Sequence, residues 1–261
     1  MHLAVRKNFE EKVSYVARMV ADMTVIDQSN FLSVDCGLPG DTFNVMVVKD
    51  VSAPTQMLAS IDHFTSKGFP MAVWSWENDV DQADFSVFTG HGLKHAEINT
   101  AMQADLSELQ ITSLHIEGLE IKRAVTTNDL LQFGTTLAAG FGASDEGDQV
   151  LAYFQRLCEY PLNNFPAMRY YLGTFHGIVV ATGTLFVGSE TVGIYDITTS
   201  NPYRRRGIGS AMFQHILEDA RSCNRRSCIL QASPDGLGIY LRAGFRPVGT
   251  VHVFENRALF D

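Results

Sequence analysis

Three consecutive strand signals that lead directly into a helix constrain the fold more than any other part of this sequence. Residues 168–175, 177–187 and 191–199 are rich in β-branched and aromatic residues. His176-Gly177, between the first two, is typical of a two-residue hairpin turn. Apolar residues then recur at helical spacing over 207–223. This order predicts an antiparallel sheet with a helix packed on it.

The rest of the second half supplies the elements that complete such a sheet. We expect a strand over 119–125, a helix over 129–139 with Thr127 as its N-cap, a helix over 145–159, a strand over 227–233, a helix over 236–243 stopped by Gly244, and a last strand or pair over 245–254. Strands and helices in this order predict an α+β protein with a mixed, mostly antiparallel sheet flanked by helices.

The first half has weaker signals, and we expect it to form a smaller α/β domain. Its predicted elements are a helix over 1–27, a strand over 43–50, a helix over 55–68 closed by Gly68, a strand over 71–78, a short helix within 81–93 and a strand over 94–104. Residues 105–118 are polar and weakly patterned, which is typical of a linker. The predicted domains are therefore 1–110 and 117–261.

Composition excludes several classes of protein. Hydrophobic residues make up 46% of the chain and charged residues 19%, which is ordinary for a globular protein. No apolar run approaches the ~18 residues of a membrane span. The first twenty residues are charged through their middle and read as an amphipathic helix, not as a secretory signal. The four cysteines lack metal-site or disulfide spacing. We therefore expect a cytoplasmic protein that does not act at a membrane.

Positive charge is concentrated in one short segment of an acidic chain. The net charge is −9, yet residues 201–226 hold six arginines against two acidic residues, a local charge of +4 that leaves −13 for the remainder. The acidic total argues against a nucleic-acid binder, which needs a broad basic face. A small basic segment on an acidic protein instead indicates a small, strongly anionic ligand.

The arginines stand beside a glycine-rich turn, in "NPYRRRGIGSAMFQHI" over 201–216. Gly207 and Gly209 lie where the strand 191–199 meets the next helix, and a helix N-terminus presents unpaired N–H groups to an anion. A Walker loop is excluded because no Lys-Ser/Thr follows, and a dinucleotide loop is unlikely without the third glycine. A solvated arginine cluster beside a chance glycine remains the alternative reading of the loop alone.

The segment "TTSNPYRRRGIGSAM" resembles the acyl-CoA loop of the GNAT superfamily of N-acetyltransferases, whose pattern is Arg/Gln-x-x-Gly-x-Gly/Ala. Arg204, Gly207 and Gly209 occupy its fixed positions. Pro202 departs from the pattern, because the family usually places this proline one residue earlier, so the turn could be reshaped.

A second motif extends the resemblance to about residues 117–256. "LQASPDGLGIYLRAGFRPVG" resembles the later part of the same fold, in which a short helix reads Tyr-x-x-x-Gly-Phe. Tyr240, Gly244 and Phe245 occupy those positions. The whole chain also resembles a subgroup with an additional N-terminal domain. That domain could be a degenerate GNAT-like half, and because it lacks the glycine loop we expect it to bind no coenzyme A.

The resemblance implies an enzyme that moves an acetyl group from acetyl-CoA to a primary amine of a small-molecule or amino-acid-like acceptor. It implies Tyr240 as the general acid and Asp196 as a candidate base, with ordered water or an amine that arrives deprotonated as alternatives. No metal is expected. The residues that it implies for acetyl-CoA binding are Ile197, Thr198, Thr199, Arg204, Arg205, Arg206, Gly207, Ile208, Gly209, Ser210, Ser233 and Tyr240.

A second class of function is kept open: a non-catalytic acyl-CoA binding or sensing module that acts through its N-terminal domain. Other features favour structural roles. His91, His95 and Glu97 lack the ligand count of a zinc site. Trp74 and Trp76 alternate on a strand, as core residues do more often than pocket walls. The sequence leaves the acceptor undetermined, and a homodimer stays open.

Overall fold

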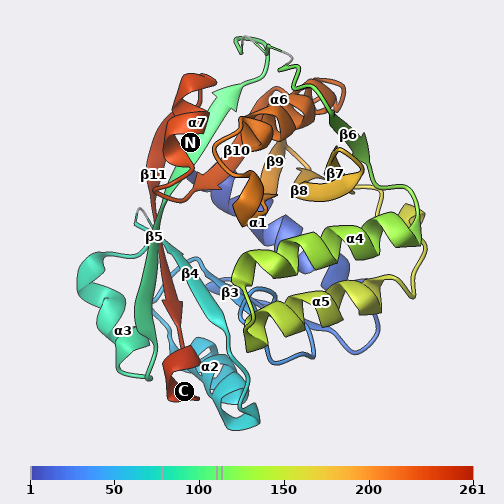
Figure 1. Cartoon of the computed structure of the whole chain (residues 1–261). Helices are drawn as coiled ribbons and strands as arrows, with labels where there is room; N and C mark the ends of the chain where they lie inside the picture. Colours follow the sequence, from blue (N-terminus) through green and yellow to red (C-terminus); the bar gives the residue numbers. More distant parts are fainter. Residues whose placement is uncertain (1, 78, 110, 113, 261) are drawn as a thin grey trace. The chain divides into compact units, whose positions relative to one another are not determined.

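The chain forms two compact units. The computed structural model describes residues 2–77, 79–109, 111–112 and 114–260 (Figure 1). Unit 1 comprises Met1–Met102, Gln231–Leu237 and Pro247–Asp261, and unit 2 comprises Gln103–Leu230 and Gly238–Arg246. Within the described residues, no helix combines the length and apolarity needed to cross a membrane. The division into domains 1–110 and 117–261 stays a prediction.

Unit 1 is a sheet with a helix on each face. Its strands lie in the order β1-β2-β3-β4-β11-β5. Its elements are α1 (His2–Ala17), β1 (Thr24–Asp27), β2 (Phe31–Asp35), β3 (Val45–Val48), α2 (Thr55–Lys67), β4 (Ala72–Trp76), a 3₁₀ turn (Gln82–Phe85), α3 (Ser86–Thr89), most of β5 (Lys94–Asp105), most of β11 (Arg246–Glu255) and a 3₁₀ turn (Arg257–Leu259).

The connection from β3 to β4 determines the arrangement of this unit. β1, β2 and β3 are antiparallel neighbours, whereas β4 runs parallel to β3, with Val45 opposite Ala72 and Val48 opposite Ser75. A parallel pair needs a crossover, and α2 supplies it. Met57, Ile61 and Phe64 of α2 are buried in one apolar cluster with residues from β2, β3 and β4. Gly68 ends the helix in the left-handed conformation, as predicted.

Two features of the first 35 residues differ from the prediction. The helix ends at Ala17 and does not continue to residue 27. Asp22 has a φ of +66°, which no helix tolerates, and the β-branched segment at 24–26 pairs with β2 instead. β2 has no counterpart among the predicted strands, because four of its five residues are buried and it lacks alternation.

The C-terminal strand β11 is the partner of β4 in unit 1. Val253 lies opposite Trp74, and Val251 lies opposite Trp76. Both tryptophans pack against Phe9 of α1, with ring centroids 4.6 and 5.7 Å apart. The two tryptophans are therefore packing residues of this unit, as the alternation indicates. The sequence predicted a last strand or pair at 245–254, and the structure has one strand.

Unit 2 contains the strands and helices that the sequence predicts most clearly. Its strands lie in the order β10-β9-β8-β7-β6. Its elements are β6 (Leu119–Arg123), α4 (Thr127–Ala138), a 3₁₀ turn (Ala139–Phe141), α5 (Asp145–Leu157), a 3₁₀ turn (Leu162–Asn164), β7 (Met168–Phe175), β8 (Ile178–Val187), β9 (Thr191–Thr199), a 3₁₀ turn (Asn201–Tyr203), α6 (Ile208–Arg221), most of β10 (Ser227–Ala232) and most of α7 (Leu237–Arg242).

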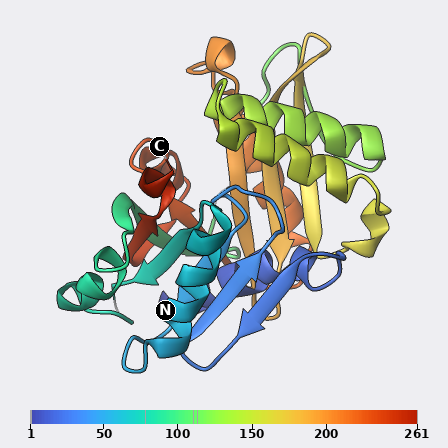
Figure 2. The ribbon, with the colours of Figure 1, turned by 90° about the horizontal axis from the view of Figure 1, so that it is seen from below.

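Helices cover both faces of the sheet in unit 2. Figure 2 shows α4 and α5 side by side on one face of β7, β8 and β9, with α6 behind these strands. β6 to β9 are antiparallel, and β10 is parallel to β9 after the crossover through α6. His176 and Gly177 both have positive φ, so the turn between β7 and β8 is the predicted two-residue hairpin.

The segment 105–118 is more firmly packed than a linker. Leu106 and Leu109 are buried. The Arg221 guanidinium of α6 donates hydrogen bonds to the carbonyl oxygens of both leucines. Gln110 and Ser113, which the prediction also covered, lie outside the described residues.

The N-cap of α4 is Thr126, one residue before the predicted Thr127. The Thr126 hydroxyl accepts a hydrogen bond from the Asp129 N–H, and the Asp129 carboxylate accepts one from the Thr126 N–H, both at 3.0 Å. Although burial opposes ionisation, the Lys122 ammonium at 2.7 Å and two backbone N–H groups lower the pKa of Asp129 to about 2. This is a capping box closed by an ion pair.

A carboxylate fixes α6 against the sheet. Asp219 accepts hydrogen bonds from Arg169, at 2.9 Å, and from the Tyr171 hydroxyl, two residues on one face of β7. Burial alone would raise the pKa of Asp219, but these two donors outweigh it and lower the pKa. The contact ties the last turns of α6 to β7 and so orients the whole helix, including its N-terminus.

We predict that Thr126→Ala lowers the free energy of unfolding by about 1 kcal/mol, because it removes the side chain that caps α4. Thr127→Ala, a matched change one residue later, leaves the cap intact and has a smaller effect. Chemical denaturation of both variants measures the difference. An equal loss in both would contradict the assignment of the cap.

We also predict that Asp219→Asn lowers the free energy of unfolding by about 2 kcal/mol at pH 7. A carboxyl whose folded-state pKa is lowered stabilises the fold above its unfolded pKa, and this contribution is lost as the pH falls through the folded value. The difference in the free energy of unfolding between wild type and Asp219→Asn therefore narrows below about pH 4. Chemical denaturation at pH 7 and pH 3 measures this difference. Glu218→Gln, a change at the neighbouring exposed residue, is the control. A gap that widens in acid would contradict the role of Asp219.

Candidate functional site

The end of β9 departs from regular strand geometry. Thr184 lies opposite Tyr195 and Thr182 opposite Thr198, so two residues of β9 face the single Gly183 of β8. Asp196, one of the two, has a φ of +54°, and its carbonyl oxygen accepts a hydrogen bond from the buried Thr182 hydroxyl at 3.0 Å. This arrangement is a β-bulge, and bulges turn the backbone and side chains of a strand end in a new direction.

β9 also separates from its other neighbour. In the described part of the chain, the parallel pairs of β9 and β10 are Thr191–Ser227, Val192–Cys228 and Gly193–Ile229, and none follows. Residues 194–199 therefore continue along β9 beyond its last paired residue on that side. A strand edge released in this way presents N–H and C=O groups that an extended, amide-containing ligand can satisfy.

A short turn leads from β9 to α6. The Ser200 N–H donates to the Val180 carbonyl, and Pro202 lies in the first turn of the 3₁₀ segment that follows. The Arg204 Nε donates to the Thr199 carbonyl at 3.0 Å. The first arginine is thus bound back to the strand end, while the two that follow it are exposed.

The backbone of this turn is left-handed at two alternate residues. Arg205 has a φ of +61° and Gly207 a φ of +80°. Alternation of this kind turns successive N–H groups toward one side, which forms an anion-binding concavity. Gly207 is also the N-cap of α6, and within the described residues no side chain caps the helix. The N–H groups at the start of α6 therefore lack intrahelical partners and carry the positive end of the helix dipole.

The side chains around the turn leave its backbone accessible. Residues 204–207 are exposed, and the Arg206 guanidinium lies over the Tyr203 ring, 5.6 Å from its centroid. The next turn of α6 is anchored instead, because Ile208, Met212 and Phe213 are buried against the sheet. A fixed helix with an open, positively charged N-terminus is the arrangement that binds phosphate groups.

Tyr240 packs beside the same helix. Its ring meets that of Phe213 edge-on, with centroids 4.9 Å apart, and that of Phe245 at 6.5 Å. Burial raises the pKa of Tyr240 to about 12. Its hydroxyl therefore keeps its proton throughout the neutral and mildly alkaline range.

The structure brings most of the sequence-predicted residues onto two adjoining stretches of unit 2. Asp196, Ile197, Thr198 and Thr199 end β9, and the loop residues from Arg204 to Ser210 follow directly. Ser233 belongs to unit 1, where its hydroxyl accepts a hydrogen bond from the Gly236 N–H at 3.4 Å, near the start of α7.

One neighbour of this site was missed by the sequence reasoning. A Cβ at Gly140, in the connection between α4 and α5, would stand 3.5 Å from Thr198 Cγ2. This connection therefore reaches the end of β9, from the face of the sheet opposite α6. The signal was the paired glycines at 140 and 142 between two helices, which the sequence analysis did not use.

The histidine pair at positions 91 and 95 does not converge. The His91 Nδ1 lies 3.1 Å from the Val87 carbonyl oxygen, whereas His95 Nε2 lies 3.1 Å from His252 Nδ1 on β11. His95 and His252 stack among Phe85 and Phe254 in unit 1. In the described part of the chain, no group of three or more potential ligands could hold a metal ion.

Comparison with known proteins gives a family match for part of the chain. Residues 141–245 match the model of the acetyltransferase (GNAT) family. A search of curated proteins found no significant sequence match. The matched segment contains the end of β9, the left-handed turn, α6 and Tyr240.

Many solved structures have the same fold at low sequence identity. A GCN5-related N-acetyltransferase from Kribbella flavida is 12% identical over 95% of each chain, with a TM-score of 0.67. One from Sphaerobacter thermophilus is 15% identical over 88% of this chain and 81% of its own, with a TM-score of 0.58. A tandem GNAT protein from the clavulanic acid biosynthesis pathway is 10% identical over 93% of this chain and 86% of its own, with a TM-score of 0.59.

These likenesses show the GNAT fold across most of the chain, and the family match covers the segment that contains the left-handed turn at Arg205 and Gly207. GNAT domains transfer an acyl group from acyl-CoA, which is the chemistry that the resemblance in the sequence implies. Residues 141–245 therefore match the GNAT acetyltransferase family, and the chain has the GNAT fold.

Proposed function

We propose that this protein is an N-acetyltransferase that moves the acetyl group of acetyl-CoA to a primary amine of a small-molecule or amino-acid-like acceptor. One observation carries the proposal: the uncapped N-terminus of α6 follows two left-handed residues and three arginines, directly after a strand end that β10 does not pair. A diphosphate and an extended amide-containing arm, joined in one ligand, would satisfy both sets of unpaired backbone groups.

The backbone supplies most of the binding in this proposal. The N–H groups from Gly207 to Ser210 face the diphosphate, and Arg205 and Arg206 add positive charge around it. Thr199, Thr198 and Ile197 extend hydrogen bonds to the arm of the coenzyme as a neighbouring strand would. Arg204 fixes the junction of the two parts through its bond to the Thr199 carbonyl.

The chemical step needs a polarised carbonyl and a stabilised leaving group. A backbone N–H at the β9 bulge polarises the thioester carbonyl and stabilises the negative charge that develops on its oxygen. The amine nitrogen forms a bond to the carbonyl carbon, and the carbon–sulfur bond breaks. The proton lost by the amine passes to Asp196 or to an ordered water.

Tyr240 acts on the departing sulfur. Its pKa of about 12 lies above that of an ordinary thiol, near 8.5, so full proton transfer from the phenol to the thiolate is uphill. A hydrogen bond from the neutral phenol to the developing thiolate is the contribution that this pKa favours. The role of Tyr240 is therefore stabilisation of the leaving group, with the proton supplied finally by solvent.

We further propose that unit 1 is a degenerate copy of the same half-fold and binds no coenzyme A. Both units have three antiparallel strands, a crossover helix and a parallel strand. However, β3 pairs with β4 along its whole length, and α2 begins after Pro54 without a glycine turn. The likeness to a tandem GNAT protein over 93% of the chain supports this origin.

We further propose a cytoplasmic location and no nucleic-acid partner. The four cysteines are free thiols, as in a reducing compartment. The acidic net charge disfavours nucleic acid as a partner.

Calorimetric titration with acetyl-CoA tests the binding site. We predict one molecule bound per chain and about tenfold weaker binding by Gly207→Ala, because a left-handed residue with a Cβ is strained by about 1–2 kcal/mol. Gly68→Ala is the matched control, since its φ of +68° imposes similar strain in unit 1. Two molecules per chain would contradict the proposal for unit 1. Equal affinities in wild type and Gly207→Ala would contradict the anion site.

Turnover tests the catalytic role. We predict that Tyr240→Phe lowers kcat with a panel of primary amines by about 10–100-fold and changes acetyl-CoA affinity little, because only the hydroxyl is removed. The rate at which free coenzyme A is released gives kcat, and Tyr160→Phe in the same unit is the control. Equal rates would exclude Tyr240 from the mechanism. Tight binding of acetyl-CoA without turnover on any amine would favour the sensing module instead.

A further inference from the structure

The two units differ by one strand at the outer edge of the sheet. In unit 2, four antiparallel strands precede the crossover helix, and the outermost, β6, covers β7 with Leu119 opposite Phe175 and Arg123 opposite Tyr171. In unit 1 only three precede it, and β1, the counterpart of β7, ends the sheet. Among the described residues of unit 1, no strand occupies the position that corresponds to β6.

The outer edge of β1 is oriented to accept another strand. The Gln28 N–H donates to the Phe31 carbonyl at 2.8 Å, so Gln28 and Phe31 form a hydrogen-bonded pair. In an antiparallel ladder such pairs alternate, and the residues that bond to β2 are therefore Thr24 and Ile26. The N–H and C=O groups of Val25 and Asp27 point away from β2, toward the open side.

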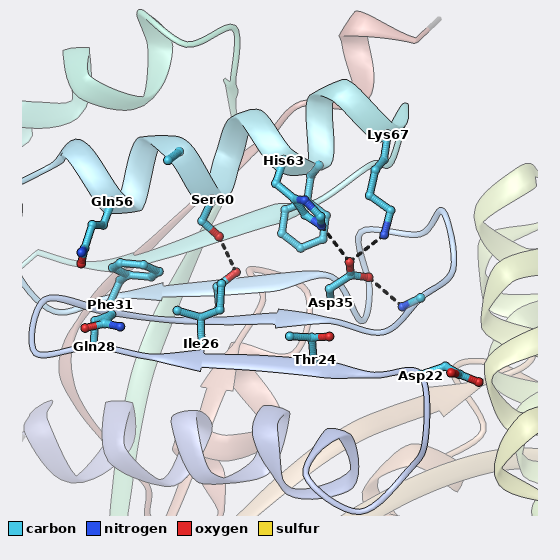
Figure 3. A pocket seen from close by; sticks show the side chains of 14 residues that line it. Asp22, Thr24, Ile26, Gln28, Phe31, Asp35, Gln56, Ser60, His63 and Lys67 are labelled. Carbon is cyan, nitrogen blue, oxygen red and sulfur yellow. Dashed lines mark hydrogen bonds and ion pairs between the residues drawn. The ribbon is translucent and has the colours of Figure 1, made fainter.

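A cavity lies over β1, beside α2. Figure 3 shows it as an elongated groove with α2 on one side and the strand pair on the other. Its volume is about 580 Å³. It is lined by Asp22 before β1, by residues of β1 and β2 that include Thr24, Ile26 and Asp35, and by the face of α2 from Gln56 to Lys67.

The groove exposes an apolar residue of β1 that a neighbouring strand would cover. Ile26 is 41% exposed, whereas the aromatic floor formed by Phe31 and Phe64 is buried. In unit 2, Leu119 and Ile121 of β6 occupy the equivalent place next to α6, and the cavity left there measures about 170 Å³. The cavity beside β1 is therefore the larger of the two.

The charged side chain of β1 does not prevent another strand from associating on the groove side. Asp27 alternates with Ile26 and so points to the other face, where it pairs with Arg18 at 2.8 Å and Lys49 at 3.1 Å. Natural edge strands avoid association through short length or charges. β1 is short, but its charged side chain is engaged away from the groove.

One end of the groove holds charges of both signs, with Asp22 and Asp35 on the strand side and His63 and Lys67 on α2. His63 Nε2 at 3.1 Å and Lys67 Nζ at 2.8 Å both contact the same oxygen of Asp35, which also draws the Gly37 N–H to its other oxygen (Figure 3). The Asp35 carboxylate therefore pairs with two basic side chains, His63 and Lys67. The Lys67 ammonium, with three donors, retains capacity for another acceptor. Thr24 lies opposite Asp35, so this end is the N-terminal end of β1.

We propose that the groove between β1 and α2 binds an extended segment of a partner protein, which adds to β1 as an antiparallel strand. The segment presents large apolar side chains at two alternate positions to the groove, as β6 does with Leu119 and Ile121 in unit 2. This mode is β-augmentation, with backbone bonds to Val25 and Asp27.

The chain itself supplies the probe. A synthetic nonapeptide with the sequence of residues 117–125, EGLEIKRAV, and a free C-terminal carboxylate carries the apolar pattern of β6. We expect saturable binding with Kd below about 1 mM, measured by fluorescence anisotropy of a labelled peptide. A peptide with serine in place of its leucine and isoleucine is the matched control and binds at least about tenfold more weakly.

Hydrogen exchange on the full-length protein locates the bound peptide. We expect the amide protons of Val25 and Asp27 to exchange about tenfold more slowly with the peptide present. Those of Thr24 and Ile26, already bonded to β2, change less. Protection confined to β7 would mean that the peptide replaces β6 in unit 2, and it would overturn the proposal.

Two variants separate strand addition from other causes. Val25→Pro removes an outward N–H without touching the bonds to β2, and we expect it to weaken binding at least about tenfold, whereas Val25→Ala retains it. Ala59→Phe, an exposed change on the groove face of α2, fills the groove and weakens binding without disturbing the core. Asp62→Phe, outside the groove, is its control.

Two results would overturn the proposal. Peptide binding that is unchanged in both Val25→Pro and Ala59→Phe would place the peptide elsewhere. A wild-type dimer in sedimentation analysis that Val25→Pro dissociates would show that a second copy of the chain occupies the edge. We expect a monomeric wild-type protein that binds the peptide, and much weaker peptide binding by both Val25→Pro and Ala59→Phe.

Discussion

Backbone groups left without protein partners are the constraint on which the proposed site depends. At the end of β9 the strand loses its pairing with β10, and a few residues later α6 begins without a capping side chain. Each unpaired N–H or C=O must be satisfied by solvent or by a ligand. Because the two sets follow one another along the chain, a single elongated anionic ligand can satisfy both.

The surrounding structure keeps those groups in place. The Asp219 contact with Arg169 and Tyr171 fixes the far end of α6, while buried Ile208 and Met212 fix its first turns. The bulge at Asp196, supported by the Thr182 hydroxyl, turns the end of β9. Flexibility is therefore expected in the arginine side chains and not in the backbone that they surround, which suits a preorganised anion site.

The sequence predicted unit 2 well because its turns are encoded locally. Gly177 and Gly207 have positive φ, and their positions in the sequence are enough to locate a hairpin and a helix start. The N-cap at Thr126 was missed by one residue because two threonines adjoin and only the capping-box partner Asp129 distinguishes them. The bulge at Asp196 has no such local signal, since it depends on which residues of β8 oppose it.

Unit 1 was predicted less completely because its pattern is set by tertiary contacts. β1 follows a helix without a glycine stop, and its short β-branched run reads as a continuation of that helix until its pairing with β2 is known. The pairing of β11 with β4 joins residues more than 170 positions apart, which no local periodicity reveals. The groove beside β1 is likewise invisible in the sequence, because it depends on which strands pair, and among the described residues of unit 1 no strand pairs with the outer edge of β1.

The comparison of the two units also explains how one half-fold supports two proposed roles. In unit 2 the outer edge is closed by β6 and the centre is opened, because β9 and β10 pair over only three positions. In unit 1 the centre is closed, since β3 and β4 pair along the whole of β3, and the outer edge is open. A sheet strand released at either place exposes the same backbone groups. Their surroundings differ: in the two proposals, arginines and a helix N-terminus favour a diphosphate in unit 2, whereas the exposed Ile26 and the cavity beside α2 favour an extended apolar segment in unit 1.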